Sequence, residues 1–141
     1  PIRAAEYGVV DGGWYKDHAE ELLFKMIMVE HIDAVRDIDE ILEIRGLDAI
    51  MLGPCDLSGS MGKLTDIYAP DVQDNIRLVV QKCRKKGIYV GVALGCGAPP
   101  DLYRHWLYMG VQMISFGQDV NLLVQAVKSN LDNLKKAIQA K

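Results

Sequence analysis

Residues 49–56 read AIMLGPCD, four apolar residues followed by a Gly-Pro turn and an acid, Asp56. Residues 24–30 read FKMIMVE, so a second apolar run also ends on an acid, Glu30. Short apolar runs bounded by turn residues are typical of buried parallel strands. The carboxyl ends of such strands form the edge at which α/β proteins bind ligands and metal ions. The two runs therefore predict a parallel sheet that carries Glu30 and Asp56 at one edge.

The same unit, an apolar run followed by a loop and an amphipathic helix, recurs along the chain. Strands are expected at residues 24–30, 49–53, 88–94 and 112–116. Helices are expected at residues 14–22, 33–46, 70–87, 101–109 and 121–139, with a long loop at residues 54–68. Four strands that are each followed by a helix predict an α/β fold with a parallel sheet. Because the strand runs are apolar on both faces, both faces of this sheet are expected to be covered.

Four β/α units are half of an eight-unit (β/α)8 barrel, which usually needs about 250 residues. An open four-stranded sheet with helices on both faces, or two chains closing one barrel, would also satisfy the pattern. The length of 141 residues suits a single domain, residues 1–141. The chain begins at Pro1 without an initiator Met, so we expect it to be a processed chain or a part of a longer one.

Composition narrows the classes of partner. Half of the residues are apolar, a quarter are charged and the net charge is -3, with both signs mixed along the chain. This is unlike the basic stripe of nucleic-acid-binding proteins, and no apolar run approaches a membrane span of about 20 residues. We therefore expect no nucleic-acid or membrane partner. Cys55, Cys83 and Cys96 form no C-x-x-C pair, which indicates reduced thiols and a cytoplasmic protein.

The two acids suggest a cation site. Carboxylates at the carboxyl ends of neighbouring parallel strands converge, and two of them suit Mg²⁺, with Mn²⁺ and Co²⁺ as alternatives. The other positions on such an ion can take the carboxylate and keto oxygens of a 2-oxo acid, and the ion then stabilises an enolate as a Lewis acid. The plainer interpretation stays open: Glu30 would be a solvated loop residue and Asp56 a turn former.

The turn around Asp56 adds a second feature. Residues 53–62 read GPCDLSGSMG, and Gly-rich turns allow backbone N–H groups to approach an anion closely. A structural turn without a ligand is the alternative. Ser58 and Ser60 are expected to cap this turn, His31 to lie in a loop or at a helix start, and Asp119 to cap the last helix.

Here the chain resembles a known family. The strings MVE at residues 28–30 and LDAIMLGPCDLS at residues 47–58 look like those of the metal-dependent pyruvate aldolases, the 4-hydroxy-2-oxoheptanedioate and 2-dehydro-3-deoxyglucarate aldolases. The similarity runs from RAAEYG at residues 3–8 to the final helix. It implies that the chain corresponds to the carboxyl-terminal half of a (β/α)8 TIM barrel. It also implies a class II lyase, which cleaves or forms an aldol of a 2-oxo acid, giving pyruvate and an aldehyde through a metal-bound enolate.

The resemblance also implies site residues. Glu30 and Asp56 match the metal ligands, and the turn of Gly53, Pro54, Cys55 and Asp56 matches the backbone that holds the pyruvate carboxylate. Many relatives have Gln at the position of Met28, which places Met28 beside the substrate without that hydrogen bond. The catalytic His and substrate-binding Arg of the family belong to the amino-terminal half of the barrel, so no catalytic residue is assigned in this chain.

Two further interpretations remain. The chain could be a non-catalytic or incomplete half-barrel that binds metal and pyruvate and self-associates through its open sheet edges. It could also be a related lyase built on the same barrel. In each case a homo-oligomer is expected, with a small 2-oxo acid as the ligand.

Overall fold

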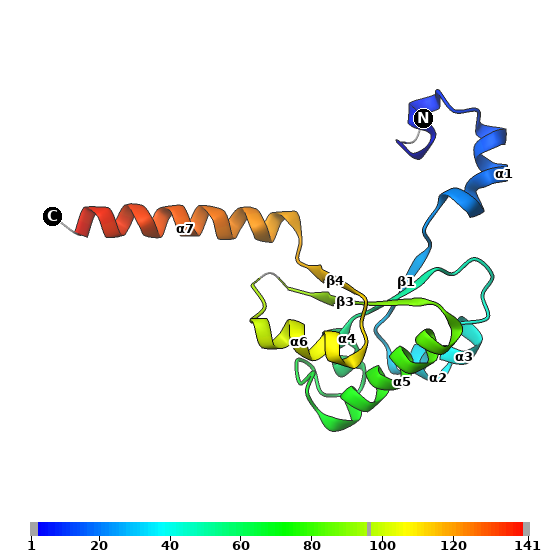
Figure 1. The fold of residues 1–141 in the computed structure, drawn as a ribbon. Helices are drawn as coiled ribbons and strands as arrows, with labels where there is room; N and C mark the ends of the chain where they lie inside the picture. Colours follow the sequence, from blue (N-terminus) through cyan, green and yellow to red (C-terminus); the bar gives the residue numbers. More distant parts are fainter. Residues whose placement is uncertain (1–2, 96, 140–141) are drawn as a thin grey trace.

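The computed structural model describes residues 3–95 and 97–139. It contains one sheet of four strands in the order β1-β2-β3-β4, with every neighbouring pair parallel (Figure 1). The strands are β1 (Met26–Val29), β2 (Ala49–Leu52), β3 (Tyr89–Leu94) and β4 (Met113–Phe116). Each strand pairs with the next one in the chain, so the predicted α/β fold of four consecutive β/α units is confirmed.

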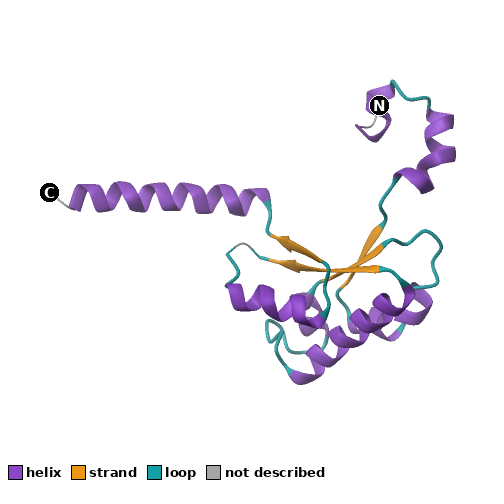
Figure 2. Ribbon diagram, viewed as in Figure 1, coloured by secondary structure: helices purple, strands orange, loops and turns teal. Residues whose placement is uncertain are grey.

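The helices that connect the strands lie on one side of the sheet (Figure 2). They are α2 (Ile32–Arg36), α3 (Ile38–Ile41), α4 (Pro54–Ser60), α5 (Pro70–Lys86) and α6 (Pro100–Met109). The 3-10 helix η1 (Arg3–Gly8) and α1 (Gly12–Leu22) precede the sheet, and α7 (Asp119–Gln139) follows it. Figure 1 shows α1 and α7 projecting away from the layered body. The alternative of an open sheet with helices on both faces is therefore wrong for the described residues.

Local sequence explains the boundaries of the longest connecting helix, α5. Pro70 occupies its first turn, where a missing N–H costs nothing, and Gly87 ends it in the left-handed region with φ 74°. The side chains of this helix that face the sheet are buried: Val72, Ile76, Val79, Val80 and Cys83. The predicted helix at residues 70–87 is thus confirmed, because both its end signals and its apolar stripe are local.

Strand register separates the two faces of the sheet. Val29, Leu52 and Val92 align across the sheet and are fully buried in the core beneath the helices. The neighbouring row aligns Met28, Met51, Gly91 and Met113 on the opposite face, which we call the uncovered face. No helix among the described residues lies against this face (Figure 2), and Met28 is 51% exposed. The four units therefore have the form of a barrel wall with a helix-covered outer layer.

The helix expected at residues 33–46 is two short helices, α2 and α3, which meet at Asp37. The N-cap of α2 is His31, whose Nδ1 accepts a hydrogen bond from the N–H of Asp33 at 3.2 Å. The expectation that His31 lies in a loop or at a helix start is thus confirmed, and the helix begins at Ile32, one residue before the expected range.

The loop expected at residues 54–68 begins with a helix, α4. Pro54 stands at its first position, where its fixed φ favours a helical start, and Leu57 and Ser58 are buried along it. The Gly and Ser residues of the segment obscured this helix, since both residue types usually indicate loops. The correction matters because the helix contains Asp56.

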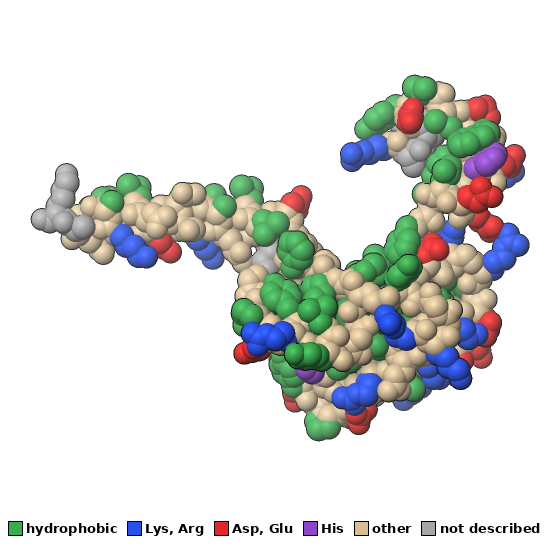
Figure 3. Space-filling model, viewed as in Figure 1, with side chains coloured by type: hydrophobic (Ala, Val, Ile, Leu, Met, Phe, Trp, Pro, Cys, Tyr) green, Lys and Arg blue, Asp and Glu red, His purple; other side chains and the backbone are tan. Residues whose placement is uncertain are grey.

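Each residue of the helix α7 is exposed, and no described helix or strand packs along it (Figure 1). Its apolar side chains recur every three or four positions and form one stripe: Val120, Leu123, Val124, Val127, Leu131, Leu134 and Ile138. Figure 3 shows hydrophobic side chains along this helix and over the part of the body from which α1 and α7 project. Among the described residues, no helix combines the length and the apolarity needed to cross a membrane.

Candidate functional site

The two predicted acids lie at the same edge of the sheet. Glu30 directly follows β1, and Asp56 is in the first turn of α4, which begins after β2. The two strands pair up to Val29 and Leu52, and the N–H of Gly53 donates to the carbonyl of Val29 at 3.1 Å. Both acids are exposed. The exits of β1 and β2 are thus adjacent and each carries one carboxylate.

The side chain of Glu30 lies against Gly53. A Cβ atom added to Gly53 would be 3.0 Å from the Glu30 Oε2 and 2.8 Å from the Glu30 Cβ, and the second distance is shorter than real Cβ contacts. The same added atom would be 3.7 Å from the Sδ of Met28. The Glu30 carboxylate therefore reaches over the turn that leads to Asp56, and the Met28 thioether lies beside it.

The turn itself forms the start of α4. Pro54 is buried, whereas Cys55 and Asp56 are exposed. The first N–H groups of a helix have no intrahelical acceptors, so they can bind an anion or water. A carboxylate such as that of Asp56 is also favourable near this positive helix end. Asp56, a predicted site residue, is thus also a carboxylate that stabilises the start of α4.

The two serines, which were expected to cap the turn, lie within α4 instead and donate to backbone carbonyls of the same helix. The Ser58 Oγ donates to the carbonyl of Cys55 at 2.7 Å, and the Ser60 Oγ donates to that of Leu57 at 2.7 Å. The Ser60 Oγ also accepts a hydrogen bond from the N–H of Ile32 at 2.9 Å. This second contact was missed by sequence reasoning, because no local pattern indicates a bond across 28 positions.

Other titratable residues in the segments that follow the strands have structural partners. His31 caps α2, and Asp119 begins α7, where its Oδ1 accepts from the N–H of Val120 at 2.7 Å. The Nζ of Lys63 lies 2.6 Å from both carboxylate oxygens of Asp71, and this hydrogen bond lowers the pKa of Asp71. Lys63, which follows α4, is therefore paired with the carboxylate of Asp71 at the start of α5.

The described cysteines are unpaired by disulfides, and one of them belongs to the core. Cys55 and Cys83 are free cysteines, and Cys96 lies outside the described residues. Cys83 is buried in the core, and this burial raises the pKa of its thiol to about 11. Its thiol is therefore protonated at neutral pH, which fits a packing role.

The donor set fits a hard cation held by few protein ligands. Among residues 3–95 and 97–139 no cluster of three or more His, Cys, Asp or Glu side chains is placed to hold a metal ion. Mg²⁺, however, usually keeps several waters and binds through one or two carboxylates plus substrate oxygens. Glu30 and Asp56 are both exposed, and the Glu30 carboxylate lies over Gly53, which has no side chain to block it. This arrangement matches that type of site.

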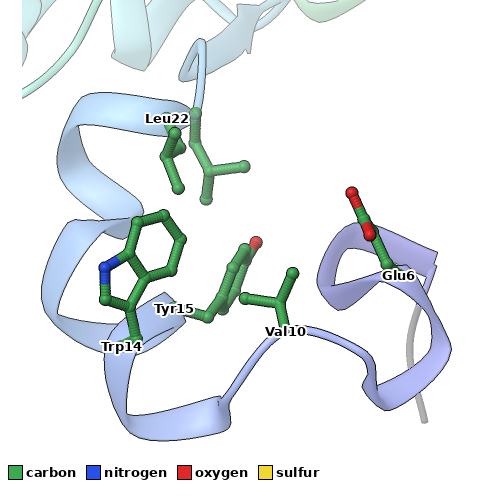
Figure 4. Close-up of a pocket in the computed structure, with 6 residues that line it drawn as sticks. Glu6, Val10, Trp14, Tyr15 and Leu22 are labelled. Atoms are coloured by element: carbon green, nitrogen blue, oxygen red, sulfur yellow. The ribbon is translucent and has the colours of Figure 1, made fainter.

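A separate cavity lies between η1 and α1. Figure 4 shows Glu6, Val10, Trp14, Tyr15 and Leu22 around it. It offers one carboxylate among aromatic and apolar side chains, on the segment that precedes the sheet. This cavity is therefore a poorer place for a hard cation than the edge that carries Glu30 and Asp56.

Comparison with known proteins points to one family. The model of the HpcH/HpaI aldolase/citrate lyase family matches residues 7–126. A 2-keto-3-deoxy-L-rhamnonate aldolase of Klebsiella pneumoniae is 33% identical over 133 residues, which are 94% of this chain and 48% of that protein. A hydroxypyruvate/pyruvate aldolase of Pseudomonas aeruginosa is 29% identical over 114 residues, which are 81% of this chain and 41% of that protein. The chain spans about half the length of the curated relatives it matches.

Solved structures give the same picture. An HpcH/HpaI aldolase/citrate lyase family protein from Burkholderia cenocepacia superposes with a TM-score of 0.77 at 28% identity, over 95% of this chain and 50% of that one. An HpcH/HpaI aldolase from Desulfitobacterium hafniense gives a TM-score of 0.72 at 27% identity, over 89% and 48%. The four β/α units therefore correspond to about half of a TIM-barrel protein.

Proposed function

Because this chain belongs to the HpcH/HpaI aldolase/citrate lyase family, we propose that it carries the metal and pyruvate site of a class II pyruvate aldolase. The observation that carries this proposal is the Glu30 carboxylate lying over Gly53, at the strand edge that also holds Asp56. The names of the relatives, aldolases for 2-keto-3-deoxy-L-rhamnonate and for hydroxypyruvate/pyruvate, support a 2-oxo acid as the substrate class. The free thiols of Cys55 and Cys83 are compatible with work in the cytoplasm.

Glu30 and Asp56 would hold the divalent ion. Mg²⁺ is the expected ion because both ligands are hard carboxylates, and Mn²⁺ or Co²⁺ could replace it. When bound, the ion supplies Lewis-acid polarisation of the 2-oxo acid and so favours enolate chemistry.

The turn and the neighbouring strand would hold the substrate. The first-turn N–H groups of Cys55 and Asp56 would bind the pyruvate carboxylate, while Pro54 fixes the backbone at the helix start. Because Gly53 has no side chain, it would not block the approach of the pyruvate carboxylate to these N–H groups. Met28 would form an apolar wall beside the pyruvate methyl group, since its thioether lies next to the Gly53 turn.

The reaction that fits these ligands is reversible aldol cleavage. The bond between C3 and C4 of the substrate breaks, and its electron pair stays on the three-carbon fragment as an enolate. The C4 hydroxyl loses its proton as the aldehyde forms, and protonation of the enolate at C3 then gives pyruvate. Glu30 and Asp56 serve as ligands in this proposal, so neither is assigned the proton transfer.

Two measurements on pyruvate test the proposal. The protein with Mg²⁺ or Mn²⁺ is expected to exchange the pyruvate methyl protons with D2O, as followed by proton NMR, and EDTA should stop this exchange. A non-catalytic half-barrel would instead bind pyruvate without exchange, which appears as protein-dependent Mn²⁺ broadening of the methyl signal alone. If the protein causes no exchange and no broadening, the proposal is wrong. Exchange without cleavage of any 2-keto-3-deoxy acid would favour a related lyase.

We also propose that the chain self-associates through its uncovered face and its sheet edges. The described sheet has four strands, whose outer members β1 and β4 each leave one edge unpaired. Open edges and exposed apolar surface both favour pairing with another chain. A second copy would supply four further strands, the number that a closed eight-stranded barrel needs, and would cover Met26 and Met28, which are 45% and 51% exposed.

Light scattering during size-exclusion chromatography tests this association. The chain is expected to elute as a dimer or larger assembly, and Met26→Lys should shift it toward monomer because a charge would enter the covered surface. Leu78→Lys is the matched control, since Leu78 is 39% exposed on α5, on the other side of the sheet. A monomeric unmodified chain at micromolar concentration would contradict the proposal.

A further inference from the structure

We propose that Ser60 is a positioning residue, whose hydroxyl locks the loop that carries Glu30 to the helix that carries Asp56. This inference rests on the proposed function, in which both carboxylates hold one cation. The bond from the Ile32 N–H to the Ser60 Oγ is 2.9 Å long and joins the start of α2 to the end of α4.

Two hydrogen bonds bracket both acids. On the amino side of Glu30, the carbonyl of Val29 accepts from the N–H of Gly53 at 3.1 Å. On its carboxyl side, the N–H of Ile32 donates to Ser60 at 2.9 Å. Gly53 precedes Asp56 and Ser60 follows it, so the same two bonds enclose both acid-bearing segments in one ring of chain. The first bond is between backbone atoms, whereas the second depends on a side chain and can be removed by substitution.

The hydroxyl of Ser60 meets a need of the backbone. Ile32 is the first residue of α2, so its N–H has no acceptor within that helix. The N-cap side chain of His31 serves the next N–H, that of Asp33. The Ser60 hydroxyl donates its proton to Leu57 at 2.7 Å, which turns its lone pairs toward Ile32. Because this contact is partly buried, water competes poorly for it.

Loss of the hydroxyl would therefore act on the metal site through the backbone. Ser60→Ala leaves the Ile32 N–H without its acceptor and frees the loop that begins at Glu30. Residues that orient metal ligands typically cost about 10- to 100-fold in metal affinity when they are replaced. We expect Ser60→Ala to weaken Mn²⁺ binding by about tenfold, and Ser60→Thr, which keeps a hydroxyl at the same atom, to restore most of the affinity.

The experiment is a Mn²⁺ titration of the whole chain, with free Mn²⁺ measured by electron paramagnetic resonance. Gln73→Ala is the matched control, because the Gln73 Nε2 makes a comparable part-buried bond to the carbonyl of Ile67 at 2.6 Å, within another part of the fold. It should lower Tm as Ser60→Ala does but leave the Mn²⁺ affinity unchanged. Hydrogen exchange of the Ile32 amide gives a second readout, and it should speed up in Ser60→Ala and stay slow in Ser60→Thr.

The outcomes separate this inference from the proposed function. If the unmodified chain shows no saturable Mn²⁺ binding, or if Glu30→Gln binds Mn²⁺ with unchanged affinity, the proposed cation site itself is overturned. Binding that is lost in Glu30→Gln but unchanged in Ser60→Ala would overturn the role of Ser60 alone. Equal weakening in Ser60→Ala and Gln73→Ala would also overturn it, because general stability would then explain the effect.

Discussion

Asp56→Asn is expected to abolish saturable Mn²⁺ binding in the micromolar range and to lower metal-dependent pyruvate exchange by about 100-fold or more. The substitution keeps the shape of the side chain but removes one of two anionic ligands, and ligand carboxylates supply most of the attraction for a hard cation. A 100-fold loss corresponds to about 2.7 kcal/mol. Electron paramagnetic resonance of free Mn²⁺ measures the binding, and proton NMR of pyruvate measures the exchange.

A matched control for this change lies in the next helix. Asp71 is also exposed in the first turn of a helix that begins with Pro, and Asp71→Asn removes a carboxylate from the same kind of helix start. Its loss breaks the ion pair with Lys63 but should leave Mn²⁺ affinity unchanged. Similar Mn²⁺ affinity in Asp56→Asn and the unmodified chain would mean that Asp56 only stabilises the start of α4.

A double-mutant cycle tests whether the two acids hold one ion. If they do, Glu30→Gln and Asp56→Asn should each remove most of the Mn²⁺ affinity, and the double variant should lose little more Mn²⁺ affinity than either single variant. Groups that act on a shared partner are strongly non-additive in this way. Additive losses would instead indicate two separate weak sites.

Much of the fold could be predicted because its signals are local. The apolar runs gave the strands, and Pro70 and Gly87 gave the ends of α5 within one residue. The structure departs from prediction where signals compete or are absent. The second half of α4 contains Gly and Ser, residues more typical of a turn, and only the buried Leu57 and Ser58 reveal that the segment packs as a helix.

The site shows the same division between local and distant information. The neighbouring positions of Glu30 and Asp56 follow from strand order alone, because parallel strands bring their carboxyl ends to one edge. The contact of Glu30 with Gly53 and the bond of Ser60 to Ile32 depend on how two loops pack, which no local pattern encodes. The uncovered face is a third case: an apolar strand pattern indicates that a face needs cover, but it does not say what covers it.

Gly53→Ala is expected to weaken Mn²⁺ binding by about 30-fold or more while the chain stays folded. The φ of -108° at Gly53 is open to any residue, so the conflict comes from contact and not from backbone conformation. The added Cβ would lie 2.8 Å from the Glu30 Cβ, and a Cβ cannot swing aside by rotation of its own side chain. The end of β1 or the turn must therefore shift, and displacements approaching 1 Å at a functional site can cost about 100-fold.

The matched control for this change is Gly91→Ala, on the same sheet but away from the acids. Its added Cβ would lie 3.0 Å from the flexible Met51 Sδ and 3.1 Å from the Met113 Cβ, so we expect a stability loss of about 1–3 kcal/mol without a change in Mn²⁺ affinity. Urea unfolding measures stability, and electron paramagnetic resonance measures Mn²⁺ binding. Native Mn²⁺ affinity in a folded Gly53→Ala chain would place the cation away from the Glu30 carboxylate. Selective loss in Gly53→Ala would tie the cation to the place where the Glu30 carboxylate lies over Gly53.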